Sequence, residues 1–225
     1  MSIHRPELEQ ALERRLRAWR EVESLRRPTR EIDLRVVSFS RQVGSGGRLI
    51  AARVAQVLEL PFFDWDALRR IAPARSGATT EEPSADSLEV EGGSLRHVDQ
   101  PPPDYREQLT TAMEAIADGD GGLVLGRGAN FILPRERCLR VRIVAPPEIR
   151  ADYLARILEL EPEAADAAVR DGDADRRAFV RHYFDADIDE DTHYDLVLNM
   201  DLYSLDAAVV MVLQAWGAAR QIWGG

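Results

Sequence analysis

A β-branched segment that runs through a glycine-rich turn into an apolar helix pattern constrains the fold of this 225-residue chain most strongly. Residues 34–40 are typical of a strand, residues 49–58 have helical periodicity, and between them stand Gly44, Gly46 and Gly47. Glycine lets backbone amides converge on an anion without interference from Cβ atoms, and the following helix adds the positive end of its dipole. The segment predicts a phosphate-binding turn.

The turn departs from the complete Walker A motif, GxxxxGK[ST], at three positions. With Gly46 in the second glycine position, Arg41 takes the first glycine position, Gly47 the lysine position and Arg48 the serine or threonine position. The chain contains no lysine, so a bound phosphate must be neutralised by arginine or by a metal ion. The nearby groups are the guanidinium groups of Arg41 and Arg48 and the hydroxyls of Ser40 and Ser45. A glycine-rich turn that only allows close packing is the alternative.

Strand-like and helix-like segments alternate along the rest of the chain. Further strands are predicted over residues 60–64, 122–126, 139–144 and 194–200. Helices are predicted over residues 66–72, 105–117, 146–160, 162–170, 173–184 and 204–223. Strands separated by helices indicate βαβ crossovers, and therefore a parallel sheet with helices on both faces.

Two segments differ from this pattern. Residues 1–30 contain an amphipathic helix over 7–26, which we expect to dock on the domain, on a second copy of the chain or on another protein; membrane attachment is the alternative. Residues 31–225 form the predicted domain. Within it, residues 73–104 hold five prolines and seven acidic residues, which predicts a flexible acidic insertion or lid.

Composition excludes several classes of function. The net charge of −10 and the pI near 5.0 argue against a nucleic-acid-binding protein, whose contact surface is basic. No apolar run approaches the roughly 20 residues of a membrane span, and the start of the chain is charged rather than signal-like. The single Cys138 excludes an internal disulfide and fits a reducing compartment. We therefore expect a cytoplasmic protein.

Two more polar groups follow predicted strands. Asp64 and Arg70 lie just after the second strand, where they can offer an acceptor and a fork-shaped donor to a second ligand. Asp64 also suits a helix N-cap. Arg127 stands between two glycines at the end of the third strand, the sheet edge where parallel α/β proteins bind ligands. A turn arginine paired with a surface carboxylate is the alternative.

A third group of arginines lies on a predicted helix. Arg170, Arg177 and Arg181 are spaced by seven and four residues and so share one face, which can close over a polyphosphate or form solvated salt bridges. The nearby run of alternating aspartates fails as a calcium loop, because its sixth position is Glu190 and its twelfth is Leu196. The four histidines have no metal-ligand spacing, so the metal ligands stay unassigned.

Taken in order, six segments resemble the cytidylate kinase-like family, a branch of the P-loop nucleoside monophosphate kinases. They are SRQVGSGGR, LPFFDWDALRR, LVLGRGANFIL, LRVRIVAP, DADRRAFVRHYF and YDLVLN, and the resemblance covers about residues 34–215. This branch carries S-R-E-x-G-S-G-G in place of a true Walker A motif. Here Gln42 replaces the usual glutamate.

The resemblance implies a three-layer α/β/α P-loop kinase-like fold with a five-stranded parallel sheet. It implies that Gly44 to Arg48, with Ser40 and Arg41, hold the phosphates of ATP with Mg²⁺. Asp64, Arg70 and Arg127 would bind the acceptor nucleotide. Arg170 and Arg177 would be lid arginines, acting with Arg48 and Arg127 during transfer.

The function expected from these residues is ATP-dependent phosphoryl transfer to a nucleoside monophosphate, with cytidylate as the first choice. Such transfer requires in-line positioning and neutralisation of spreading negative charge more than covalent chemistry from the protein. Two alternatives stay open: a nucleotide-binding sensor or pseudokinase with little or no turnover, and a kinase of another small metabolite.

Overall fold

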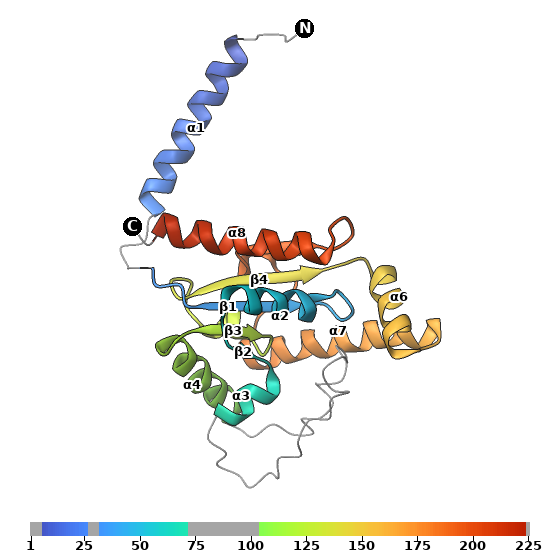
Figure 1. Cartoon of the computed structure of the whole chain (residues 1–225). Coiled ribbons are helices and arrows are strands. Elements are labelled where there is room, and N and C mark those ends of the chain that lie inside the picture. Colours follow the sequence, from blue (N-terminus) through green and yellow to red (C-terminus); the bar gives the residue numbers. More distant parts are fainter. Residues whose placement is uncertain (1–5, 27–31, 72–103, 224–225) are drawn as a thin grey trace. The chain divides into compact units, whose positions relative to one another are not determined.

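The computed structural model describes residues 6–26, 32–71 and 104–223 (Figure 1). Its contacts group into two compact units, Met1–Glu31 and Ile32–Gly225. The first unit contains helix α1, Pro6–Arg26, which confirms the helix predicted over 7–26. The insertion predicted at 73–104 lies outside the described residues except for Asp104, which precedes helix α4.

The second unit is built on a parallel sheet of five strands among the residues described. They are β1 (Val36–Arg41), β2 (Phe62–Phe63), β3 (Gly122–Leu125), β4 (Cys138–Val144) and β5 (Leu196–Asn199), in the spatial order β2-β3-β1-β4-β5. Strand β1 is central, and its Val36 is in register with Gly122 of β3 and Cys138 of β4. Alternate side chains of β1 therefore enter opposite layers of the core.

Helices α2 (Gly47–Leu58) and α8 (Leu205–Trp223) cover one face of the sheet (Figure 1). On this side Val37 and Phe39 of β1 are buried against apolar side chains of both helices, among them Ile50, Val54, Val212 and Trp216. Each fully buried side chain of this size contributes about 1.5–3 kcal/mol through removal of apolar surface from water. This layer holds the start of α2 firmly at the end of β1.

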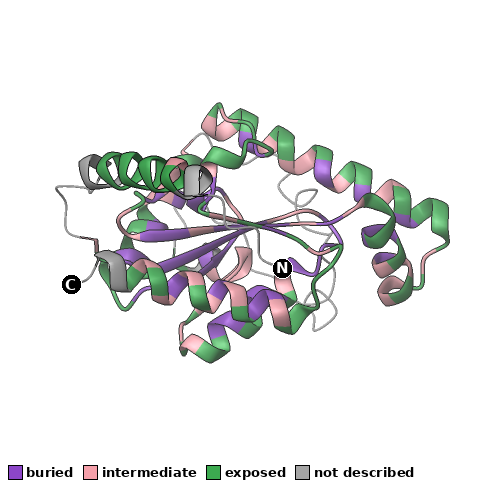
Figure 2. Ribbon diagram, turned by 90° about the horizontal axis from the view of Figure 1, so that it is seen from above, coloured by how far each residue is buried: buried purple, intermediate pink, exposed green. Residues whose placement is uncertain are grey.

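Helices α3 (Trp65–Ile71), α4 (Tyr105–Asp118) and α5 (Ala129–Ile132) lie on the opposite face. Val36 and Val124 of the sheet are buried there against Leu68, Leu109 and Met113. Figure 2 shows the strands as largely buried between helices whose outer faces are exposed. The three layers confirm the predicted α/β/α fold.

Helices α6 (Pro147–Leu158) and α7 (Pro162–Phe184) follow β4 as a hairpin, and a short 3₁₀ helix (Asp191–His193) precedes β5. Separate helices were expected over 162–170 and 173–184, but α7 is continuous, and that prediction is wrong. Gly172 costs only about 1 kcal/mol in a helix interior. The missing side chain is also useful, because a Cβ at Gly172 would lie 2.7 Å from Val43 Cγ2.

Candidate phosphate-binding site

The predicted phosphate-binding segment forms a tight turn, residues 42–47, that we call the glycine turn. Gly44 and Gly46 both have φ of +74°, a left-handed conformation that favours glycine. The amide and the hydroxyl of Ser45 both donate to the carbonyl oxygen of Gln42, at 3.4 and 2.9 Å. Helix α2 then begins at Gly47, and the first amides of a helix have no acceptor within it. The turn thus has the strand, bend and helix start of a phosphate-binding loop.

Close neighbours explain the glycines of the turn. A Cβ at Gly44 would lie 2.6 Å from the backbone oxygen of Arg150, and one at Gly46 would lie 3.0 Å from Leu205 Cδ2. A larger residue at Gly44 would displace the backbone of α6, whereas one at Gly46 would press on the Leu205 side chain of α8. From the sequence alone, the glycines were explained by the approach of backbone amides to an anion. The structure adds a second reason, which is close packing against neighbouring residues.

A buried ion pair supports the turn from beneath. Asp173 Oδ1 accepts from the amide of Val43 at 3.0 Å, and Arg150 Nη1 donates to the Val43 carbonyl at 3.2 Å. The two side chains meet each other at 2.6 Å and are only 5% and 10% exposed. Arg150 Nε also donates to the carbonyl of Ala145 at 2.9 Å. The pair therefore satisfies both backbone groups of Val43 and ties the hairpin of α6 and α7 to the glycine turn.

Arg48 and Asp64, predicted for the donor and the acceptor respectively, contact each other. Arg48 Nη2 lies 2.9 Å from Asp64 Oδ2, and both side chains are about one-fifth exposed. Asp64 Oδ1 accepts from the amide of Ala67 at 3.1 Å, as expected for the N-cap alternative. Arg70 belongs to α3, but its side chain lies outside the described part of the structure.

Arg41 extends from the end of β1 across the start of α2. A Cβ at Gly47 would lie 2.6 Å from Arg41 Cβ and 3.1 Å from its Cγ. Its guanidinium reaches the turn after β3, where a Cβ at Gly126 would lie 2.5 Å from Arg41 Nη1. The carbonyl of Arg41 accepts from Arg176 Nη1 of α7 at 2.7 Å. Arg41 thus connects the glycine turn with the predicted acceptor side.

Arg127 lies among aromatic side chains at the same turn. Its Cζ is 4.0 Å from the ring centre of Trp65 and 5.5 Å from that of Phe179, and its Nη1 donates to the Tyr105 hydroxyl at 3.3 Å. Burial lowers the pKa of the Arg127 guanidinium, an effect that Tyr105 partly offsets. Cation–π contacts hold the Arg127 guanidinium in place. The backbone φ of +54° directs it into this cluster.

Ser40 belongs to a different cluster. It shares the β1 face of Val36 and therefore points to the side of the sheet opposite α2. Its hydroxyl accepts from Arg142 Nη1 at 3.0 Å, and Arg142 also meets Asp189 at 2.5 Å. Burial raises the pKa of the adjoining Tyr194 hydroxyl. The structure does not bring Ser40 together with the other residues predicted to hold phosphate.

Helix α7 turns its predicted arginines outward. Arg170, Arg177 and Arg181 share a face as their spacing predicted, and that face is exposed. Arg177 Nη1 lies 3.6 Å from Asp189 Oδ2. The inward face carries Val169, Asp173 and Val180, all buried, and the partly buried Arg176. Counting the helical period from Val169 would have placed Asp173 and Arg176 on the inward face of α7 from the sequence alone. No comparable pattern in the sequence singled out Arg150.

The described residues contain no group of three or more His, Cys, Asp or Glu side chains arranged to hold a metal ion.

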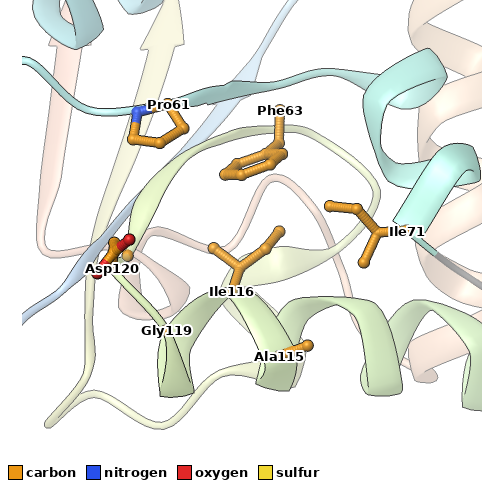
Figure 3. Close-up of a pocket in the computed structure, with 8 residues that line it drawn as sticks. Pro61, Phe63, Ile71, Ala115, Ile116, Gly119 and Asp120 are labelled. Atoms are coloured by element: carbon orange, nitrogen blue, oxygen red, sulfur yellow. The ribbon is translucent and has the colours of Figure 1, made fainter.

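A cavity of about 240 Å³ lies away from the glycine turn, at the amino ends of β2 and β3 (Figure 3). Phe63, Ile71 and Ile116 point into it, with Pro61 and Asp120 at its edge. It is therefore at the edge of the sheet opposite the glycine turn.

Fold and site together define the class of the protein: a P-loop kinase-like α/β protein with the architecture of phosphotransferases. The model of the cytidylate kinase-like family matches residues 36–202, and the chain belongs to this family. No curated protein matches the chain. Among the helices described, none is long and apolar enough to cross a membrane.

Several solved structures are similar to the chain, and the first of them shares its fold. An uncharacterized protein from Eubacterium ventriosum has 15% identity and a TM-score of 0.66, over 83% of this chain and 99% of that chain. Shikimate kinase from Acinetobacter baumannii, in complex with shikimate, has 15% identity and a TM-score of 0.48, over 84% and 96% of the two chains. Shikimate kinase from Bacteroides thetaiotaomicron has 13% identity and a TM-score of 0.49, over 81% and 98%.

Proposed function

We propose that the protein transfers the terminal phosphoryl group of ATP to a nucleoside monophosphate, with cytidylate as the first acceptor to test. One observation carries the proposal. At the carboxyl edge of the sheet, arginines from three separate elements are linked: Arg41 of β1 reaches Gly126, the residue before Arg127, and its carbonyl accepts from Arg176 of α7. Several guanidinium groups beside backbone amides suit two phosphate-bearing ligands better than one uncharged ligand.

The residues present fit the triphosphate of ATP. The turn is closely packed, because a Cβ at Gly44, Gly46 or Gly47 would meet Arg150, Leu205 or Arg41. Leu205 lies beside Gly46, with its Cδ2 3.0 Å from a Cβ built on that glycine, and the exposed Leu202 and Tyr203 precede Leu205 in the chain. They can contact the base of the donor while the amides of the turn hold its phosphates. Magnesium usually binds substrate phosphates and water with few protein ligands, so the phosphates of ATP would be its main ligands here.

In the proposed reaction a phosphate oxygen of the acceptor attacks the terminal phosphorus of ATP. The bond from that phosphorus to the bridging oxygen breaks, and ADP leaves with the bond's electrons. Magnesium, when bound, neutralises charge on the donor phosphates. Arg127 would orient the acceptor phosphate, with Asp64 and Arg70 on its nucleoside. Arg170, Arg177 and the inward-facing Arg176 are the lid candidates on α7.

The proposal is tested with purified protein, ATP and magnesium against CMP, dCMP, UMP, AMP and GMP, with the products separated by chromatography. We expect a nucleoside diphosphate to form, fastest from CMP. ATP binding without product from any acceptor, including a metabolite mixture, would identify a sensor or pseudokinase. A product formed only from the metabolite mixture would identify a kinase of another small metabolite.

Replacing Arg127 with alanine is expected to weaken binding of the acceptor monophosphate about 10- to 100-fold, because a charge-assisted hydrogen bond contributes about 1.5–3 kcal/mol. ATP affinity should stay close to that of the wild type. Titration calorimetry with CMP and ATP separately measures both. The control is Arg53→Ala, an exposed arginine of α2 whose Nη1 contacts Gln56. Identical CMP titrations for Arg127→Ala and the wild type would contradict the assignment.

A further inference from the structure

The lysine position of the Walker motif is filled by a different residue. Gly47 stands at that position, and the stem of Arg41 lies where its side chain would begin, 2.6 Å from a Cβ built on Gly47. A Cβ contact below 3.0 Å is not tolerated without movement, and here the opposing atom is the Arg41 Cβ, which is attached directly to the backbone of β1. Position 47 therefore cannot carry lysine while Arg41 keeps this conformation.

The guanidinium of Arg41 lies between the two halves of the proposed site. Arg41 shares the β1 face of Val37 and Phe39, the face covered by α2, so its side chain leaves the strand toward the start of that helix. Its Nη1 reaches Gly126, the residue before Arg127. Arg176 fixes the Arg41 backbone through its carbonyl. The stem of Arg41 thus lies against Gly47 of the glycine turn, and its charge lies beside the turn on the acceptor side.

Arg48, the second cation next to the glycine turn in the sequence, is committed elsewhere. Arg48 follows Gly47 on α2, but its Nη2 pairs with Asp64 at 2.9 Å, and its Cζ lies 5.7 Å from the ring centre of Phe62. These contacts direct Arg48 toward β2 and the start of α3. To reach a phosphate on the glycine turn, it would have to give up the ion pair.

From this geometry we infer that Arg41 supplies the cationic charge that lysine supplies in a Walker motif, delivered from the end of the strand instead of the start of the helix. The inference rests on the proposed function and adds the residue that binds the donor phosphates. Arg41 and Gly47 form a matched pair, in which the glycine makes room for the arginine stem. The planar guanidinium can bind two phosphate oxygens at once, whereas lysine acts as a point charge.

Binding measurements without acceptor test the inference apart from turnover. Titration calorimetry with ATP and with inorganic tripolyphosphate compares the wild type with Arg41→Met, which keeps an apolar stem beside Gly47 but removes the charge. We expect both ligands to bind at least about tenfold more weakly to Arg41→Met, since a charge-assisted hydrogen bond is lost. Arg53→Ala should bind both ligands as the wild type does.

A swapped variant provides the second test. Gly47→Lys alone should lower the melting temperature, because the new side chain meets the Arg41 stem. Arg41→Gly combined with Gly47→Lys removes the collision and rebuilds the Walker arrangement. We expect the double variant to bind ATP within about fivefold of the wild type, since the charge returns to the same space.

The outcomes separate the two proposals. If wild-type protein binds no nucleoside triphosphate, the proposed function is wrong. If the wild type binds ATP and a folded Arg41→Met protein binds it equally well, Arg41 is not the phosphate cation, while the proposed function stands. If Arg41→Met does not fold, Arg41→Lys and the swapped variant decide: ATP affinity retained by both supports the inference, and its loss in both overturns it.

Discussion

Replacing Asp173 with alanine is expected to lower the free energy of unfolding by about 3–5 kcal/mol, because it leaves the Arg150 charge buried without its partner. The Arg150 side chain is only 5% exposed, and water cannot replace the lost carboxylate without opening the contact between the hairpin and the turn. The same change removes the acceptor for the Val43 amide. We expect the glycine turn to lose its conformation in the same variant, so ATP binding should fall as well.

Urea unfolding followed by circular dichroism measures this effect, with Asp152→Ala as the matched control. Asp152 is an exposed carboxylate on α6, and its replacement should change stability by no more than about 0.5 kcal/mol. Replacing the pair by Arg150→Met and Asp173→Leu together should not restore stability. Apolar substitutes for a buried ion pair are often neutral, but here they would leave both backbone groups of Val43 and the carbonyl of Ala145 without partners. Wild-type stability in Asp173→Ala would show that the pair does not support the turn.

Replacing Gly44 with alanine is expected to destabilise the protein by about 2–5 kcal/mol and to abolish nucleotide binding. Two terms add up. The left-handed φ of +74° costs a residue with a Cβ about 1–2 kcal/mol, and overpacking typically costs about 1–3 kcal/mol. The Cβ would lie 2.6 Å from the backbone oxygen of Arg150, which can move only if α6 moves.

Gly217→Ala is the control for this substitution, and its expected effect has the opposite sign. Gly217 lies within α8, and a Cβ there would meet nothing within 4 Å. Alanine in a helix interior is more favourable than glycine by about 0.5–1 kcal/mol, so this variant should be slightly more stable than the wild type. Thermal unfolding of both variants and calorimetry with ATP provide the comparison. If Gly44→Ala binds ATP normally, the glycine turn is not the phosphate-binding site.

Much of the fold was predictable because strands and helices are encoded by local patterns. The period of apolar residues located β1, α2, α4, β4 and α8 to within a few residues, and their alternation indicated the parallel three-layer arrangement. The continuous helix α7 was missed at Gly172. Glycine is a weak helix former, and the contact that favours it there comes from Val43, far away in the sequence.

The site was predicted in part, for the same reason. The glycine turn is contiguous in sequence, and its residues could be read together. Arg150 and Asp173 could not be connected with it, because their bonds to Val43 join positions 107 and 130 residues apart. The hydrogen bond from Arg176 to Arg41 spans 135 residues. From sequence, Arg176 is distinguished from the exposed Arg177 only by counting the helical period from the apolar Val169.

The sequence by itself determined the parallel α/β architecture, the glycine-rich turn between strand and helix, and the absence of a Walker lysine, since each depends on residue types within a short window. Only the tertiary structure decided which arginine lies beside that turn. Arg41 and Arg48 flank the turn closely on either side in the sequence, but β1 directs Arg41 across Gly47, while Asp64 attracts Arg48 toward α3. Side-chain direction depends on strand pleat and on partners from distant segments, and these exist only once the chain has folded.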